Sequence, residues 1–155
     1  MQQYSPEAMK NIRDMNLGIC VERDAAIQGI ATTPLFTIHV GAVKMLSLVG
    51  YITVVIDDAL ELHIDTAPTA GTATALSTTS GSLDTFIAGR QLHLPATVGA
   101  HLVSTGGAFI DVCPEWIIPV GTLNCHGETA ATVTGMIKWT MVYVPFDEGA
   151  YVTAA

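Results

Sequence analysis

The chain has 155 residues, of which 50% are hydrophobic and 13% are charged, and its formal net charge is −8. A chain of this length forms one domain that buries about two thirds of its unfolded surface, so it needs neither a disulfide nor a metal merely to fold. Only six Lys and Arg are spread along the chain. Because they form no basic cluster that could neutralise phosphates, the charge pattern argues against nucleic acid as a partner.

The first part of the chain, residues 1–34, is expected to be an N-terminal arm attached to a β domain at residues 35–155. Its polar start lacks the apolar stretch of a secretory signal. A short helix is expected at residues 6–15, because Ser5 suits the N-cap and Pro6 suits the first turn. Two interpretations of the arm stay open: it lies on a neighbouring subunit, or it closes its own barrel.

Residues 35–58 are the most apolar stretch, but Lys44 near the middle makes a membrane span costly. From Lys44 onward every second residue is apolar, and the residues between them are partly polar. This alternation predicts a long strand with one face in a core rather than a membrane span or a buried helix. Gly41 and Ala42 precede this strand, so a tight hairpin or a bent, bulged strand pair is expected. Gly50 predicts a bulge or a close approach of another group to the backbone. The apolar parity comprises Leu46, Leu48, Gly50, Ile52, Val54 and Ile56.

The rest of the chain repeats the alternation in shorter pieces. Residues 67–81 are small and Thr-rich and are expected to form an exposed loop or an edge strand. Turn signals about every 8–12 residues are typical of a sandwich or barrel. The predicted fold is therefore all-β, a single-domain antiparallel β-sandwich or barrel, jelly-roll-like, with an N-terminal arm. Strands are expected at residues 61–65, near 83–88, 91–94 and 100–104, and at 122–126 and 134–144.

Few residue patterns in the sequence suggest chemistry. The five histidines lack the short spacings of a zinc motif, so a metal site would have to be assembled across strands. Glu61, His63 and Asp65 share one face of a predicted strand and could bind a cation, but a solvated strand face is the favoured interpretation. The three cysteines fit buried, reduced thiols. No nucleophile or phosphate-loop motif is present, and we expect no enzyme activity, no cofactor and no metal.

Three segments occur in a characteristic order along the chain: "TTPLFTIHVGAVKMLSLVGYIT" early, "PVGTLNC" late and "GMIKWTMVYVPFDEGAYVTAA" at the end. Together they resemble a family of small virion proteins of tailed bacteriophages, in which a similar opening strand pair and closing segment recur. The sequence departs from the family pattern at His39, Lys44 and Phe146, where smaller or more apolar residues are expected. The most specific matches are Gly135, Ile137, Trp139, Tyr143, Val144, Pro145, Gly149, Ala150 and Val152.

The resemblance implies a head decoration, or cement, protein on the capsid surface of the virion, made in the cytoplasm of the bacterial host. Such proteins clamp neighbouring subunits of the major capsid protein, commonly as homotrimers, and a buried interface of about 1,000 Å² or more would reinforce the shell. Acidic faces would meet basic capsid patches. The residues expected to contact the capsid or a sister subunit are Met9, Ile12, Met15, Leu17, Trp116 and Tyr151.

The alternative function is that of a β domain associated with a phage tail or fibre, which binds a host glycan. Sugar rings stack on exposed aromatic side chains, and Tyr51, Trp116 and Tyr151 are the candidates for this role. Aromatic residues make up only 6% of the chain, which counts modestly against this alternative.

Overall fold

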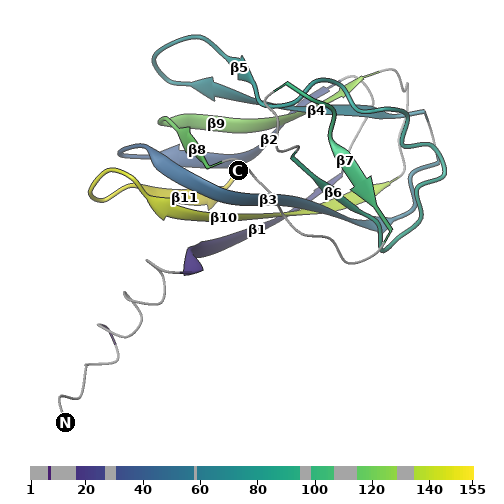
Figure 1. Cartoon of the computed structure of the whole chain (residues 1–155), viewed down its shortest axis with the longest axis horizontal. Helices are drawn as coiled ribbons and strands as arrows, with labels where there is room; N and C mark the ends of the chain where they lie inside the picture. Colours follow the sequence, from purple (N-terminus) through teal and green to yellow (C-terminus); the bar gives the residue numbers. More distant parts are fainter. Residues whose placement is uncertain are drawn as a thin grey trace.

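The computed structural model describes Glu7 and residues 17–26, 31–57, 59–94, 99–106, 115–128 and 135–155. In this part of the chain, eleven strands form two antiparallel sheets that pack face to face (Figure 1). Sheet A has the order β1 (Ile19–Ala26), β10 (Met136–Pro145), β3 (Val43–Val54), β6 (Gln91–His93) and β7 (Val103–Thr105), and β8 (Trp116–Ile118) also pairs with β3. Sheet B has the order β11 (Tyr151–Ala154), β2 (Ala31–His39), β9 (Gly121–Glu128), β4 (Glu61–Pro68) and β5 (Thr74–Ala75).

The strand pairs are nested along the chain. Strand β1 pairs with β10, β2 with β9, β3 with β8, and β4 with β5. This is the pattern of a long antiparallel ribbon that folds back on itself and rolls into two sheets, which is a jelly roll. The prediction of an all-β, jelly-roll-like sandwich is confirmed.

The core lies between the two sheets and follows the alternation of the strands. On β10 every second side chain is buried, beginning at Ile137 and ending at Tyr143, and the other side chains are half-buried or exposed. Full burial of each large apolar side chain contributes about 1.5–3 kcal/mol relative to exposure. Trp139 and Phe36 are the largest fully buried side chains, and they come from opposite sheets.

A β-bulge divides strand β3 into two halves. Ser47 pairs with Val142 and Met45 pairs with Tyr143, so Leu46 is an extra residue without a partner on β10. Because a bulge reverses the faces of a strand, Met45 points into the core before it and Leu48 points into the core after it. The predicted apolar face is therefore correct from Leu48 to Ile52 and at Ile56. It is wrong at Leu46, which is half-buried, and at Val54, which is exposed beyond a second register shift.

Two predictions about connections need correction. Strands β2 and β3 do not form a hairpin, because β2 belongs to sheet B and β3 to sheet A, and the turn at residues 40–42 carries the chain between sheets. The strand predicted near residues 83–88 is absent, and only Phe86 forms an isolated bridge, to Ile56. The strands predicted at residues 61–65, 122–126 and 134–144 are confirmed as β4, β9 and β10.

The predicted boundary after residue 34 is also wrong, because the sandwich begins earlier. Strand β1 pairs with β10 of the same chain, as the interpretation in which this segment closes its own fold expects. The helix predicted at residues 6–15 lies outside the described residues except for Glu7. Among the residues that the structure describes, no helix has the length and hydrophobicity needed to cross a membrane.

Candidate functional site

A histidine cluster, consisting of His63, Asp65 and His126, lies on the outer face of sheet B. His63 and Asp65 are two residues apart on β4, and His63 is directly opposite His126 on β9. Because alternate side chains point to opposite faces of a strand, Leu62 and Ile64 enter the core while these polar residues point outward. The side chains of His63, Asp65 and His126 are 21%, 16% and 25% exposed, so the cluster is partly shielded but open to solvent.

The three side chains of the histidine cluster are in close contact. The rings of His63 and His126 stack with centroids 4.5 Å apart and planes 2° from parallel. Nε2 of His126 lies 2.7 Å from Oδ2 of Asp65. One potential ligand atom from each residue lies within 4.8 Å of the other two, which is the arrangement of a small metal site.

A second layer of polar groups orients the histidine cluster. Oγ1 of Thr32 on β2 lies 2.9 Å from Nδ1 of His126, and Nδ2 of Asn124 donates a hydrogen bond of 3.0 Å to Oδ1 of Asp65. Oε1 of Glu128 is 3.1 Å from Nδ1 of His63, close enough for an ion pair although the direction is poor for a hydrogen bond. These contacts leave Oδ2 of Asp65 and Nε2 of His126 facing each other.

Cys125 is excluded from the cluster although it precedes His126. Its side chain is buried on the inner face of sheet B. Burial, helped by the Asp65 carboxylate, raises the pKa of the Cys125 thiol from 9.0 to about 12. Because this thiol is held protonated and lies on the inner face of sheet B, it does not belong to the histidine cluster on the outer face.

The sequence indicated only part of this cluster. Glu61, His63 and Asp65 were expected on one face, and the structure confirms that His63 and Asp65 are there and half-buried. His126 was missed because it is far away in the sequence, and only the register between β4 and β9 brings it opposite His63. Glu61 pairs in register with Glu128 at the end of the same ladder.

The start of β1, the β2–β3 turn and the β10–β11 turn lie at one end of the sandwich (Figure 1), and these segments carry several exposed apolar side chains. The start of β1 is in register with the end of β10, and β8 is in register with the start of β3, which brings these segments to the same end. We name this surface the turn end. It consists of Leu17, Val40, Ile117, Phe146 and Tyr151.

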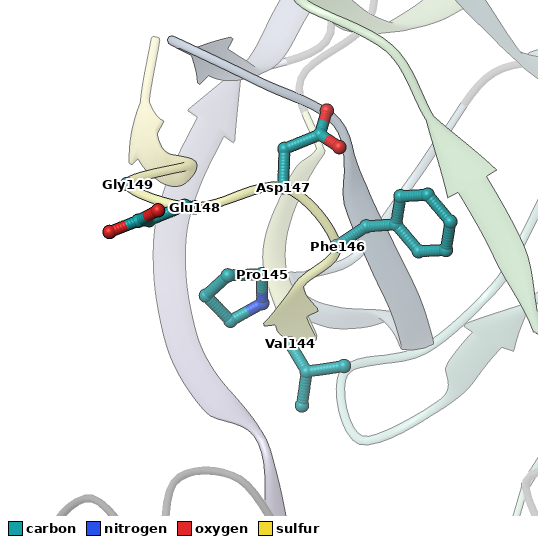
Figure 2. Close-up of a pocket in the computed structure, with 6 residues that line it drawn as sticks. All are labelled: Val144, Pro145, Phe146, Asp147, Glu148 and Gly149. Carbon is teal, nitrogen blue, oxygen red and sulfur yellow. The ribbon is translucent and has the colours of Figure 1, made fainter.

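The β10–β11 turn is held firmly against the β2–β3 turn. Oδ2 of Asp147 accepts a hydrogen bond of 2.7 Å from the backbone N–H of Ala42, whose carbonyl accepts from Phe146 and Asp147. Val40 adopts a φ of +69°, a strained conformation for a β-branched residue. The turn lines a shallow pocket in which Phe146 points away from Glu148 (Figure 2).

The structure separates the predicted contact residues into three groups. Leu17 and Tyr151 are exposed at the turn end, by 69% and 46%. Trp116 is only half-buried and packs against the core, and its neighbour Ile117 is the exposed residue of β8. Met9, Ile12 and Met15 lie outside the described residues. Phe146 and Val40 were not predicted, because nothing in the sequence indicates that these two turns lie side by side.

No protein-family model matches the chain, and no curated protein matches it either. Among solved structures, the chain is similar to one described as "Structure of infectious bursal disease virus Gx strain", with 17% sequence identity and a TM-score of 0.22. The similarity covers 87% of this chain and 33% of the viral chain, so this chain spans about a third of the matched chain. A likeness this weak says nothing about function, and the assignment of the fold rests on the strand topology alone.

Proposed function

We propose that the protein is a bacteriophage head decoration protein, which binds the assembled shell of the major capsid protein as a homotrimer and stabilises it. The observation that carries the proposal is the turn end, which holds five of the nine large apolar side chains that are exposed in the described part of the chain; the other four are Tyr51, Val54, Ile87 and Met136. Exposed apolar surface rimmed by polar groups is typical of protein–protein contact sites. The resemblance of the first and last segments of the sequence to phage virion proteins supports the same function.

The charge of the turn end suits a basic partner. Asp147 and Glu148 follow Phe146 in the β10–β11 turn, and Glu115 precedes β8, where its carboxylate pairs with Nζ of Lys44 at 2.5 Å. The net charge of the whole chain is −8. Complementary charge accelerates docking and fixes its orientation, and the apolar side chains supply the affinity.

The copy number of the protein in purified phage particles tests the proposal. Quantitative mass spectrometry would compare the protein with the major capsid protein. A decoration protein is expected at hundreds of copies per particle, because it binds at repeated positions of the shell. A handful of copies would place it in the tail, and its absence from particles would contradict virion membership.

Variants at the turn end test which surface binds. We expect the double variant Phe146→Asp, Tyr151→Asp to bind capsids at least about 10-fold more weakly than the native chain in co-sedimentation, because it places charge in an apolar contact. Ile87→Asp is the matched control. Ile87 is about as exposed as Phe146, but it lies in the connection between β5 and β6, near the opposite end of the sandwich from the turn end. Equal binding of all three proteins would show that the turn end is not the contact surface.

One observation favours the second candidate, a tail or fibre domain that binds a host glycan. One face of the Tyr151 ring stacks on His39, with centroids 4.6 Å apart, and the side chain is still 46% exposed. A tyrosine held in this way could stack a sugar ring on its other face. Binding on a glycan array that is lost in Tyr151→Ala would support this candidate, whereas a decoration protein is expected to bind no glycan.

A further inference from the structure

We propose that His63, Asp65 and His126 form a binding site for a divalent transition-metal ion of the zinc type. Two imidazoles and one carboxylate are a ligand set that suits Zn²⁺ and not Ca²⁺ or Mg²⁺, which prefer oxygen ligands. The site lies on the outer face of sheet B, far along the strands from any contact used in the proposed function. The inference therefore does not rest on that function.

The distances within the histidine cluster require only small side-chain movements. Tetrahedral zinc with bonds of about 2.0–2.2 Å places its ligand atoms about 3.3 Å apart. The distance of 2.7 Å between Nε2 of His126 and Oδ2 of Asp65 must lengthen slightly. The other distances between ligand atoms, which are at most 4.8 Å, must shorten. The rings of His63 and His126 must also tilt toward each other, since their planes are now parallel. All of these changes are changes of side-chain orientation, on a strand face that is partly open to solvent.

The outer contacts of the cluster are those of a metal site. If His126 binds the ion through Nε2, its Nδ1–H donates to the hydroxyl of Thr32, and that hydrogen bond fixes the tautomer. Asn124 holds one oxygen of Asp65 and leaves the other for the metal. Oε1 of Glu128 lies 3.1 Å from Nδ1 of His63 and would have to turn toward the ring to accept its N–H, as in the carboxylate–histidine pairs that commonly support a ligand imidazole.

The electrostatics of sheet B favour a cation. None of its five strands contains a Lys or Arg, whereas Glu61, Asp65 and Glu128 all lie on β4 and β9. The buried thiol of Cys125 faces the core and cannot contribute. Three protein ligands leave a fourth position on the solvent side, which a water molecule would fill.

Calorimetric titration of ZnCl₂ into the tag-free chain tests the site. We expect one Zn²⁺ per chain, and an affinity more than about 100-fold weaker in His63→Ala, His126→Ala, because both imidazole ligands are removed. His39→Ala is the matched control, since His39 is also on sheet B, with Nε2 3.0 Å from the hydroxyl of Thr153. The control is expected to bind like the native chain, and circular dichroism would verify that each variant is folded.

Two further measurements separate this site from other donors. Thr32→Val, which keeps all three ligands, is expected to weaken binding about 10-fold, as loss of an outer contact does. Alkylation of the accessible thiols, which include the exposed Cys20, is expected to leave the affinity for Zn²⁺ unchanged, because no thiol is among the proposed ligands. The proposal is overturned if the native chain binds no Zn²⁺, if the double variant binds as tightly as the native chain, or if alkylation abolishes binding.

Discussion

At the scale of single residues, Trp139 fits into the core because the residue opposite it on β3 has no side chain. Trp139 is fully buried and pairs with Gly50 across the ladder. A Cβ at position 50 would lie 2.9 Å from two carbons of the Trp139 ring and 3.0 Å from Cγ2 of Ile137. These distances are shorter than carbon atoms normally approach. The sequence predicted a bulge or a close approach at Gly50, and the structure has the close approach.

Cys125 gives the folded state a dependence on alkaline pH. Its pKa is raised from 9.0 to about 12 by burial and, secondarily, by the Asp65 carboxylate. A raised pKa means that the folded state holds the proton more tightly than the unfolded chain. The stabilisation is therefore complete below pH 9 and is lost as the pH rises toward 12, at about 1.4 kcal/mol per pH unit.

Urea unfolding at several pH values above 9 checks this expectation in the native chain and in Cys125→Ala. The free energy of unfolding of the native chain is expected to fall more steeply with pH than that of the variant, because only the native chain carries the buried thiol. The alanine variant will be less stable at neutral pH, so the slopes and not the absolute values are compared. Parallel slopes would show that the thiol titrates alike in both states.

At the scale of elements, residues 76–80 replace a neighbouring strand along part of β4. The hydroxyl of Ser80 accepts from the backbone N–H of Leu62 at 2.9 Å, and the hydroxyl of Ser77 accepts from that of Ile64 at 3.0 Å. Backbone N–H groups of the segment donate in return to the carbonyls of Leu62 and Ile64. Both serines are buried, so the edge of β4 is satisfied without a regular strand.

The double variant Ser77→Ala, Ser80→Ala is expected to lower the free energy of unfolding by about 2–4 kcal/mol, because each change leaves a buried backbone donor without its partner. Ser82→Ala is the matched control, since Ser82 is exposed and accepts only a weak bond of 3.3 Å from Asp84. Its stability is expected to stay within about 0.5 kcal/mol of the native chain. Equal denaturation midpoints for the double variant and the control would contradict the role of residues 76–80.

The sequence predicted strands well where apolar and polar residues alternate over the whole strand, and poorly at the edges of the sheets. Strands β4 and β10 alternate clearly and were found. Strand β11 has one buried side chain, Val152, and the side chains of β1 that the structure describes against the core are Ile19 and Val21, so neither strand has a strong pattern. The bulge at Leu46 could not be foreseen, because its position depends on the partner strand.

At the scale of the whole molecule, both candidate sites depend on the nested pairing of a jelly roll. The sequence placed His63 and Asp65 on one face, but His126 joins them only because β9 lies beside β4. Phe146 joins the turn end because the β10–β11 turn bonds to Ala42 in the β2–β3 turn. Local patterns do not contain such long-range neighbours, since alternation specifies which face is buried but not which strand is adjacent.

The first part of the chain can be divided experimentally at the point where the sandwich begins. Removal of residues 1–17 leaves β1 intact, so thermal unfolding followed by circular dichroism is expected to change little. Removal of residues 1–26 deletes an edge strand with half-buried Ile19 and Val21, and it also breaks the pair between Lys138 and Glu22. This second truncation is expected to cost about 2–4 kcal/mol and to expose the edge of β10 to aggregation.

The shorter truncation also tests the role expected for the apolar residues Met9, Ile12, Met15 and Leu17. If they contact the capsid or a sister subunit, the protein without residues 1–17 keeps its fold but binds capsids more weakly than the full chain, because it has lost apolar contact area. Unchanged binding would assign capsid contact to the sandwich alone, through the turn-end residues that remain, which are Val40, Ile117, Phe146 and Tyr151. Loss of the fold itself would mean that residues 1–17 pack on their own domain, and the arm would then be part of the sandwich.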